Sequence, residues 1–166
     1  MSTYYCYHSS AIGELLLAGD GEDLGLLGFP QGKMRRRHEA GWKRDAVPFR
    51  EVCFQLDAYF AGELTAFDLR LAPAGTPFQQ SVWSGLCDIP YGSTWSYGEL
   101  ARHVGRPAAS RAVGAANGQN PIPVIIPCHR VIGANGKLTG FGGGLETKEF
   151  LLKLEAEQMR PELIFA

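Results

Sequence analysis

The chain has 166 residues, of which 45% are hydrophobic, and its formal net charge is −1 at pH 7. This composition indicates an ordinary globular protein with one or two modest cores and argues against disorder. The amino terminus lacks a basic start and an apolar run, and no apolar segment is long enough to span a membrane. We therefore expect a cytoplasmic chain with no membrane partner.

The first part of the chain alternates strand and helix signals. Short β-like runs are separated by Gly and Asp turns, and one apolar pattern recurs at near-helical spacing. The predicted strands are residues 4–7, 14–17, 24–29 and 67–71, and the predicted helix is residues 52–60. A turn-rich segment then ends in Thr76 and Pro77, the predicted N-cap and first residue of a helix. We expect an α+β fold with a small α/β domain at 1–74 and a second domain at 75–166.

The second domain reads as mainly helical. Two short helical patterns follow each other closely across Gly105-Arg106-Pro107, which suggests a helix-turn-helix. Asn135-Gly136 is a hairpin signal. The predicted helices are residues 78–88, 97–104, 108–117 and 146–158.

The helix predicted at 108–117 consists mostly of small residues, and Arg111 is its single long basic side chain. A helix this slender can enter a groove or approach a backbone closely. Tight packing of an Ala-rich helix against its own core is an equally good interpretation.

Positive charge is concentrated locally. Between residues 93 and 138 there are five Lys and Arg residues and a single acidic residue, Glu99. Phosphate binding depends on such local potential, so the net charge of −1 argues only weakly against a nucleic-acid partner. A second basic cluster at 33–38 lies in a polar stretch. We interpret it as a solvated loop in preference to a second DNA contact.

The four cysteines are widely spaced, without a CxxC pair. We expect reduced thiols and no bound metal. Cys128 ends an apolar run and precedes His129 and Arg130. Basic neighbours lower a thiol pKa while burial raises it, so Cys128 is either a poised nucleophile or an inert core residue.

The residues around Cys128 resemble a known family. Pro127-Cys128-His129-Arg130-Val131-Ile132 is similar to the active-site motif of the O6-alkylguanine-DNA alkyltransferases. Residues 97–101, 111–114, 120–121 and 148–152, with Glu155, follow in the family's order and spacing. The resemblance covers about 78–157 and is loose in the first half, where Cys6 and His8 lack the partners that hold zinc in some relatives.

The resemblance implies a ribonuclease H-like first domain and a suicide DNA-repair reaction without a cofactor. A methyl or larger alkyl group would pass irreversibly from O6 of a flipped guanine, and from O4 of thymine, to Cys128. His129 would take the thiol proton through a water, and Glu155 would orient His129. Asn120 would fix the turn that presents the cysteine. Tyr97 would crowd the target's phosphate and hydrogen-bond the base, with protonation of the leaving group as its chemical task; the alternative is a helix-end tyrosine that packs its ring.

The resemblance also implies a DNA-contacting surface and a substrate pocket. Arg111 would fill the space left by the flipped base, or else contact a phosphate or solvent. We expect further DNA contacts from Ser110, Ala112, Gly114 and Arg130, and a pocket walled by Val131, Phe141 and Gly142. The partner would be double-stranded DNA containing O6-alkylguanine, bound without sequence preference.

Phe141-Gly142 replaces the Tyr-Ser of some relatives, which predicts tolerance of groups larger than methyl. The absence of a heptad pattern predicts a monomer. Three alternative interpretations are a non-enzymatic DNA binder of the alkyltransferase-like group, a cysteine hydrolase using Cys128 and His129, and a redox-sensing thiol.

Overall fold

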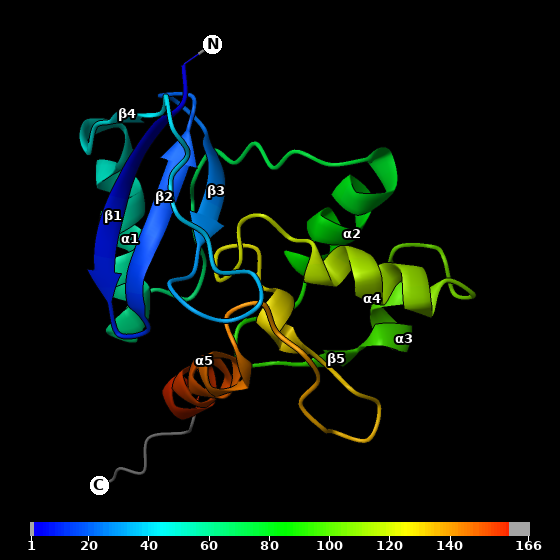
Figure 1. The fold of residues 1–166 in the computed structure, drawn as a ribbon. Coiled ribbons are helices and arrows are strands. Elements are labelled where there is room, and N and C mark those ends of the chain that lie inside the picture. Colours follow the sequence, from blue (N-terminus) through cyan, green and yellow to red (C-terminus); the bar gives the residue numbers. More distant parts are fainter. Residues whose placement is uncertain (1, 160–166) are drawn as a thin grey trace, which may run out of the picture.

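The computed structural model describes residues 2–159, which begin with a small sheet and its covering helix. The strands are β1 (Tyr4–Ser10), β2 (Gly13–Gly19), β3 (Leu24–Gly28) and β4 (Lys43–Arg44), and a short 3-10 turn, η1 (Val47–Phe49), leads into α1 (Arg50–Phe60). The sheet order is β3-β2-β1-β4, with β1 antiparallel to β2, β2 antiparallel to β3, and β1 parallel to β4. Figure 1 shows α1 against one face of this sheet and the segment after β3 crossing the other.

Strand β2 is buried on both faces. Leu15 and Leu17 belong to the main core shared with α1, whereas Leu16 and Ala18 pack on the opposite face with Trp42. Because both faces are covered, the strand reads as an almost continuous apolar run.

The strand predicted at 67–71 is wrong. Only Leu71 forms a bridge, to Leu24, and the hydrogen bonds beside it are Leu24 N to Arg70 O at 2.9 Å and Ala72 N to Leu24 O at 2.8 Å. The chain leaves the sheet edge at this point, so the extended segment pairs at one position only.

The second half of the chain is mainly helical, as predicted. Its elements are α2 (Pro77–Leu86), β5 (Trp95–Ser96), α3 (Tyr97–His103), α4 (Ser110–Gly118), the 3-10 turn η2 (Cys128–Arg130), β6 (Val131–Ile132) and α5 (Leu145–Gln158). The predicted cap of α2 is confirmed. Thr76 Oγ1 accepts from Gln79 N while the Gln79 side chain accepts from Thr76 N, which satisfies two amides at the helix start.

Helices α3 and α4 form the predicted helix-turn-helix. A second capping box, between Ser96 and Glu99, starts α3, and Gly105 adopts a positive φ of 77° in the turn that follows. Helix α4 buries Val113 and Ala116 and is tied to α2 by the Trp83 indole, which donates to the Ala116 carbonyl at 2.8 Å. In Figure 1 the three helices gather away from the sheet.

The hairpin predicted at Asn135-Gly136 forms only its turn. Gly136 has a φ of 80°, and Gly133 N donates to Lys137 O at 2.9 Å. Strand β6 pairs in parallel with β5, so no antiparallel ladder flanks the turn.

One apolar cluster runs through the chain from β2 and α1 to α2, α3, α4 and the segment before η2. No helix within residues 2–159 is both long and apolar enough to cross a membrane.

Candidate active site

The loop before Cys128 is held rigidly by Asn120. Its buried side chain donates to the Ile126 carbonyl at 2.8 Å and accepts from Ile122 N at 3.0 Å. Between these points Val124 has a φ of 74°, a left-handed conformation that is strained for a β-branched residue. The amide hydrogen bonds hold this strained loop, which delivers Cys128 to the first position of η2.

Glu155 of α5 is the hub of a buried polar network. His129 Nε2 lies 2.7 Å from Glu155 Oε2, and Arg130 donates Nε to Oε1 at 2.8 Å and Nη2 to Oε2 at 3.0 Å. Tyr59 of α1 adds a hydroxyl donor to Oε2 at 2.6 Å. The His129 and Glu155 side chains are 0% and 1% exposed, so this hydrogen-bonded pair is shielded from bulk water.

The network sets the charge of both partners. Burial raises the pKa of Glu155, but the hydrogen bonds and charges of His129 and Arg130 outweigh it and lower the pKa to about 2. Burial lowers the pKa of His129, against the opposing effect of Glu155. At neutral pH the imidazole is therefore neutral, with Nε2 donating to the carboxylate. Its Nδ1 is buried and has no hydrogen-bond partner among residues 2–159.

The Cys128 thiol is protonated at rest. Burial raises its pKa to about 11, while a hydrogen bond with Asn120 and the charge of Lys148 act in the opposite direction. Lys148 is itself fully buried, and its Nζ donates to the Val131 carbonyl at 2.7 Å. Nucleophilic chemistry at this sulfur requires a base, and Lys148 favours the thiolate once it forms.

Cys128 lines a cavity of about 210 Å³ formed by both halves of the chain. Of the three residues expected to wall the substrate pocket, Phe141 and Gly142 line this cavity, whereas Val131 does not, because its side chain is fully buried in the core. The remaining lining residues are Phe29, Lys33, Met34, Asn117, Gly118, Asn120, Pro123 and Gly140.

The loop after β3 closes one side of this cavity. Met34 N donates to Gly142 O at 3.0 Å, and a Cβ at Gly142 would lie 2.5 Å from Met34 Cγ. Lys33 and Met34 are exposed, in line with the interpretation of residues 33–38 as a solvated loop, and they also line this cavity. A side chain at position 142 would have to displace Met34, whose Cβ and Cγ occupy that space.

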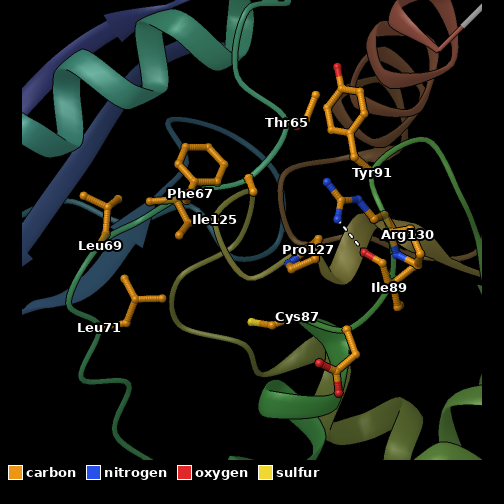
Figure 2. A pocket seen from close by; sticks show the side chains of 13 residues that line it. Thr65, Phe67, Leu69, Leu71, Cys87, Ile89, Tyr91, Ile125, Pro127 and Arg130 are labelled. Carbon is orange, nitrogen blue, oxygen red and sulfur yellow. Dashed lines mark hydrogen bonds between the residues drawn. The ribbon is translucent and has the colours of Figure 1, made fainter.

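A second cavity, of about 240 Å³, lies beside the loop of residues 120–127 (Figure 2). Phe67 approaches it from the first half of the chain, and Ile125, Pro127 and Arg130 approach it from the loop and η2. The dashed line in Figure 2 joins Arg130 Nη1 to the Ile89 carbonyl at 2.7 Å. The loop of residues 120–127 thus contributes to the walls of both cavities.

Arg130 requires a correction. We expected it to contact DNA, but it is 7% exposed and is bound to Glu155 and Ile89. A guanidinium held in this way is not available to a phosphate. Its burial depends on a carboxylate 25 residues further along the chain.

The expected DNA-contacting residues of α4 lie on one exposed face. Ser110, Arg111 and Ala112 are exposed and Gly114 is half-buried. Tyr97 packs its ring near Gly114, and its hydroxyl bonds Thr139 Oγ1 at 2.6 Å. Tyr97 is not among the residues that line the Cys128 cavity.

Two residues near the site, Lys148 beside Cys128 and Tyr59 of the Glu155 network, were missed as site residues in the sequence. Lys148 belongs to a motif that resembles the family, but nothing in the motif indicates a buried ammonium near the thiol. Tyr59 carries no local signal at all. No group of three or more His, Cys, Asp or Glu side chains within residues 2–159 is arranged to hold a metal ion.

A thiol followed in the chain by an imidazole–carboxylate pair, a cavity at the sulfur and a helix-turn-helix are together the features of a DNA-binding protein with a cysteine nucleophile. The family model described as 6-O-methylguanine DNA methyltransferase, ribonuclease-like domain, matches residues 3–73, and the model for the DNA binding domain of the same family matches residues 77–157. The chain belongs to the O6-methylguanine-DNA methyltransferase family.

Relatives agree over nearly the full length. The Methylated-DNA--protein-cysteine methyltransferase of Methanosarcina acetivorans is 58% identical over 152 residues, 92% of this chain and 97% of the relative. That of Mycobacterium tuberculosis is 51% identical over 162 residues, 96% of each chain. A solved structure of Mycobacterium tuberculosis OGT in complex with DNA has a TM-score of 0.87 and 52% identity, covering 93% of this chain and 94% of that one.

These matches confirm the predicted family, the α+β fold with a ribonuclease-like first part, and the activity. The protein repairs alkylated DNA directly, by transferring the alkyl group to one of its own cysteines.

Proposed function

We propose that Cys128 is the alkyl acceptor and that His129 is the base that deprotonates it. The observation that carries this proposal is the His129 imidazole, bound to Glu155 through Nε2 and free at a buried Nδ1, directly after a thiol that lines a cavity. A bridging water carries the proton from Sγ to Nδ1. Glu155 then stabilises the imidazolium, as a carboxylate does behind histidine in other nucleophile relays.

The thiolate attacks the alkyl carbon in line. A carbon–sulfur bond forms, the bond from carbon to O6 breaks, and its electron pair stays on guanine. Guanine takes up the proton that left the thiol, which the His129 imidazolium gives back through water. The resulting thioether has no hydrolytic exit, so one chain repairs one lesion and remains alkylated. The substrate is O6-alkylguanine in double-stranded DNA, with O4-alkylthymine as a second substrate.

Helix α4 is the proposed DNA-contacting element. Its exposed face carries the small residues Ser110, Ala112 and Gly114 around the long side chain of Arg111. Small residues permit close approach to a groove, and Arg111 fills the space vacated by the flipped base. Tyr97, beside Gly114, supports this face, and its contact with the flipped nucleotide stays a prediction.

The cavity accepts groups larger than methyl. The support is its volume of about 210 Å³ and the absence of side chains at Gly140 and Gly142 on its wall. Met34, which lines the cavity and is 41% exposed, offers a test that leaves the backbone unchanged. Met34→Trp should lower the ratio of benzyl to methyl transfer, and an unchanged ratio contradicts the proposed range.

The remaining expectations are retained as proposals. A division of the chain near residues 74 and 75 is supported by the two family models, which match 3–73 and 77–157. The monomeric state and the cytoplasmic location stay predictions.

The decisive experiment for the acceptor is intact-protein mass spectrometry after incubation with a duplex containing O6-methylguanine. We expect one added methyl group per chain, mapped to Cys128, and none in Cys128→Ala. Cys87→Ala is the matched control because Cys87 is exposed and lies outside the Cys128 cavity. A methyl group mapped to another cysteine contradicts the assignment.

The same measurement separates the alternatives. Repeated turnover without an adduct supports a hydrolase, and binding without an adduct supports a non-enzymatic binder. Loss of two hydrogen atoms, as two protons and two electrons passed to dissolved oxygen, supports a redox thiol pair that has formed a disulfide.

The role of α4 is tested with Arg111→Ala, with the exposed Arg50→Ala at the start of α1 as control. We expect Arg111→Ala to slow transfer from duplex DNA and to leave transfer from free O6-benzylguanine unchanged. An equal effect on both substrates contradicts a role in base flipping.

A further inference from the structure

We infer that Tyr59, which belongs to the sheet-and-helix part of the chain, is a positioning residue for alkyl transfer. Its hydroxyl binds the same carboxylate oxygen that orients His129. This inference rests on the proposed role of His129 as the base. It gives the first domain a part in the reaction, in addition to structural support.

The geometry joins two distant parts of the chain at one atom. Glu155 Oε2 accepts from Tyr59 Oη at 2.6 Å and from His129 Nε2 at 2.7 Å. Tyr59 and Glu155 are 96 residues apart in sequence, and each is 1% exposed. Hydrogen bonds to an ionised group are short and strong, and at this burial water cannot replace a lost donor.

Tyr59 can act only as a donor here. The ionised carboxylate has no proton to give, so the phenol must supply it. Burial and the charge of Glu155 both raise the pKa of Tyr59 far above its ordinary value, so the phenol stays protonated. The phenol is therefore available as a donor across the neutral pH range.

The ring of Tyr59 is fixed by aromatic neighbours. Its centroid lies 5.3 Å from those of Phe60 and Phe67 and 6.3 Å from that of Tyr91. Phe67 and Tyr91 are also labelled in Figure 2, where Tyr91 lies beside Arg130. The position of the hydroxyl is thus set by the packing of α1 and the segment that follows it.

The donor also limits how strongly the carboxylate favours protonated imidazole. Negative charge that Oε2 shares with the phenol is less available to stabilise a proton on His129. Removing the hydroxyl should raise the pKa of His129, which burial keeps below its ordinary value. A base with a raised pKa stays protonated to a higher pH, so the acid limb of the pH–rate profile shifts to higher pH. The other titratable or charged groups around this pair are Arg130, Lys148, Cys128 and Tyr91.

The test is Tyr59→Phe, with Tyr91→Phe as the matched control. Both changes remove one buried phenolic hydroxyl from the same aromatic cluster, but the Tyr91 hydroxyl has no hydrogen-bond partner within residues 2–159. Single-turnover transfer from O6-methylguanine DNA is measured against pH for both variants and the wild type. In Tyr59→Phe the midpoint pH of the acid limb should rise by about 0.5–1 pH unit, which corresponds to a roughly 3–10-fold lower rate at pH values below the midpoint. In Tyr91→Phe the midpoint pH should not change.

A second readout is nitrogen-15 NMR titration of the His129 imidazole in each folded variant, which needs no substrate. Superimposable pH profiles and titrations for Tyr59→Phe and the wild type overturn the inference. If His129→Ala keeps the full transfer rate, the proposed base is wrong, and this result is distinct from a failure of Tyr59 alone. A uniform loss of rate in Tyr59→Phe with an unshifted profile assigns the tyrosine a merely structural role and also overturns the inference.

Discussion

Replacing Glu155 by Gln tests the buried ion pair between η2 and α5. The Arg130 and Glu155 side chains are 8% and 1% exposed, and two guanidinium nitrogens donate to the carboxylate at 2.8 and 3.0 Å. Glutamine keeps the size and one acceptor oxygen but removes the charge, so Arg130 stays buried without its counter-ion. Removing one member of a buried pair costs about 3–5 kcal/mol of unfolding free energy.

The assay is urea unfolding at pH 7, followed by tryptophan fluorescence, together with thermal unfolding. For a chain of this size 1 kcal/mol corresponds to roughly 2–4 °C, so Tm should fall by about 6–20 °C. The urea midpoint should fall while the slope m stays constant, because the surface exposed on unfolding is unchanged.

The double variant Glu155→Gln with Arg130→Met separates the lost charge from lost packing. Removing both charges leaves no unpaired ion, so most of the stability should return. Alkyl transfer should stay impaired, because His129 still lacks its carboxylate. A cost under about 1 kcal/mol for the single variant, the value of an exposed pair, refutes this reasoning. A double variant no more stable than the single one refutes it as well.

Lys148→Met should slow single-turnover transfer on the order of tenfold, because it removes the charge that lowers the pKa of Cys128. The free energy of unfolding should stay level or rise, because a buried charge is removed. An unchanged rate contradicts this role of Lys148. Gly32→Ala and Gly136→Ala form a matched pair at φ values of 90° and 80°. Each substitution should lower the free energy of unfolding by about 1–2 kcal/mol, because alanine is strained in a left-handed backbone conformation. A Cβ at Gly32 would also collide with the Gly142 carbonyl, whereas a Cβ at Gly136 has nothing within 4 Å. Thermal unfolding should show the larger loss for Gly32→Ala, and equal losses contradict the close approach of the two loops.

Features that depend on neighbouring residues could be predicted from the sequence alone. Thr76 caps α2 because its hydroxyl needs only the amide three residues ahead, and Gly136 forms a turn because its own backbone permits the conformation. The motif around Cys128 was equally local, and it led to the family and to the pairing of His129 with Glu155 as an expectation.

Features that depend on which distant segments meet were decided by the tertiary structure. Arg130 is charged and follows the motif, yet it is buried because Glu155 and the Ile89 carbonyl meet its donors. Met34 reaches the Cys128 cavity, and Tyr59 reaches the Glu155 network, only because the first half of the chain packs against the second. Local patterns follow from rotamers, caps and turns within a few residues, whereas burial and partner choice follow from packing, which no window of the sequence contains.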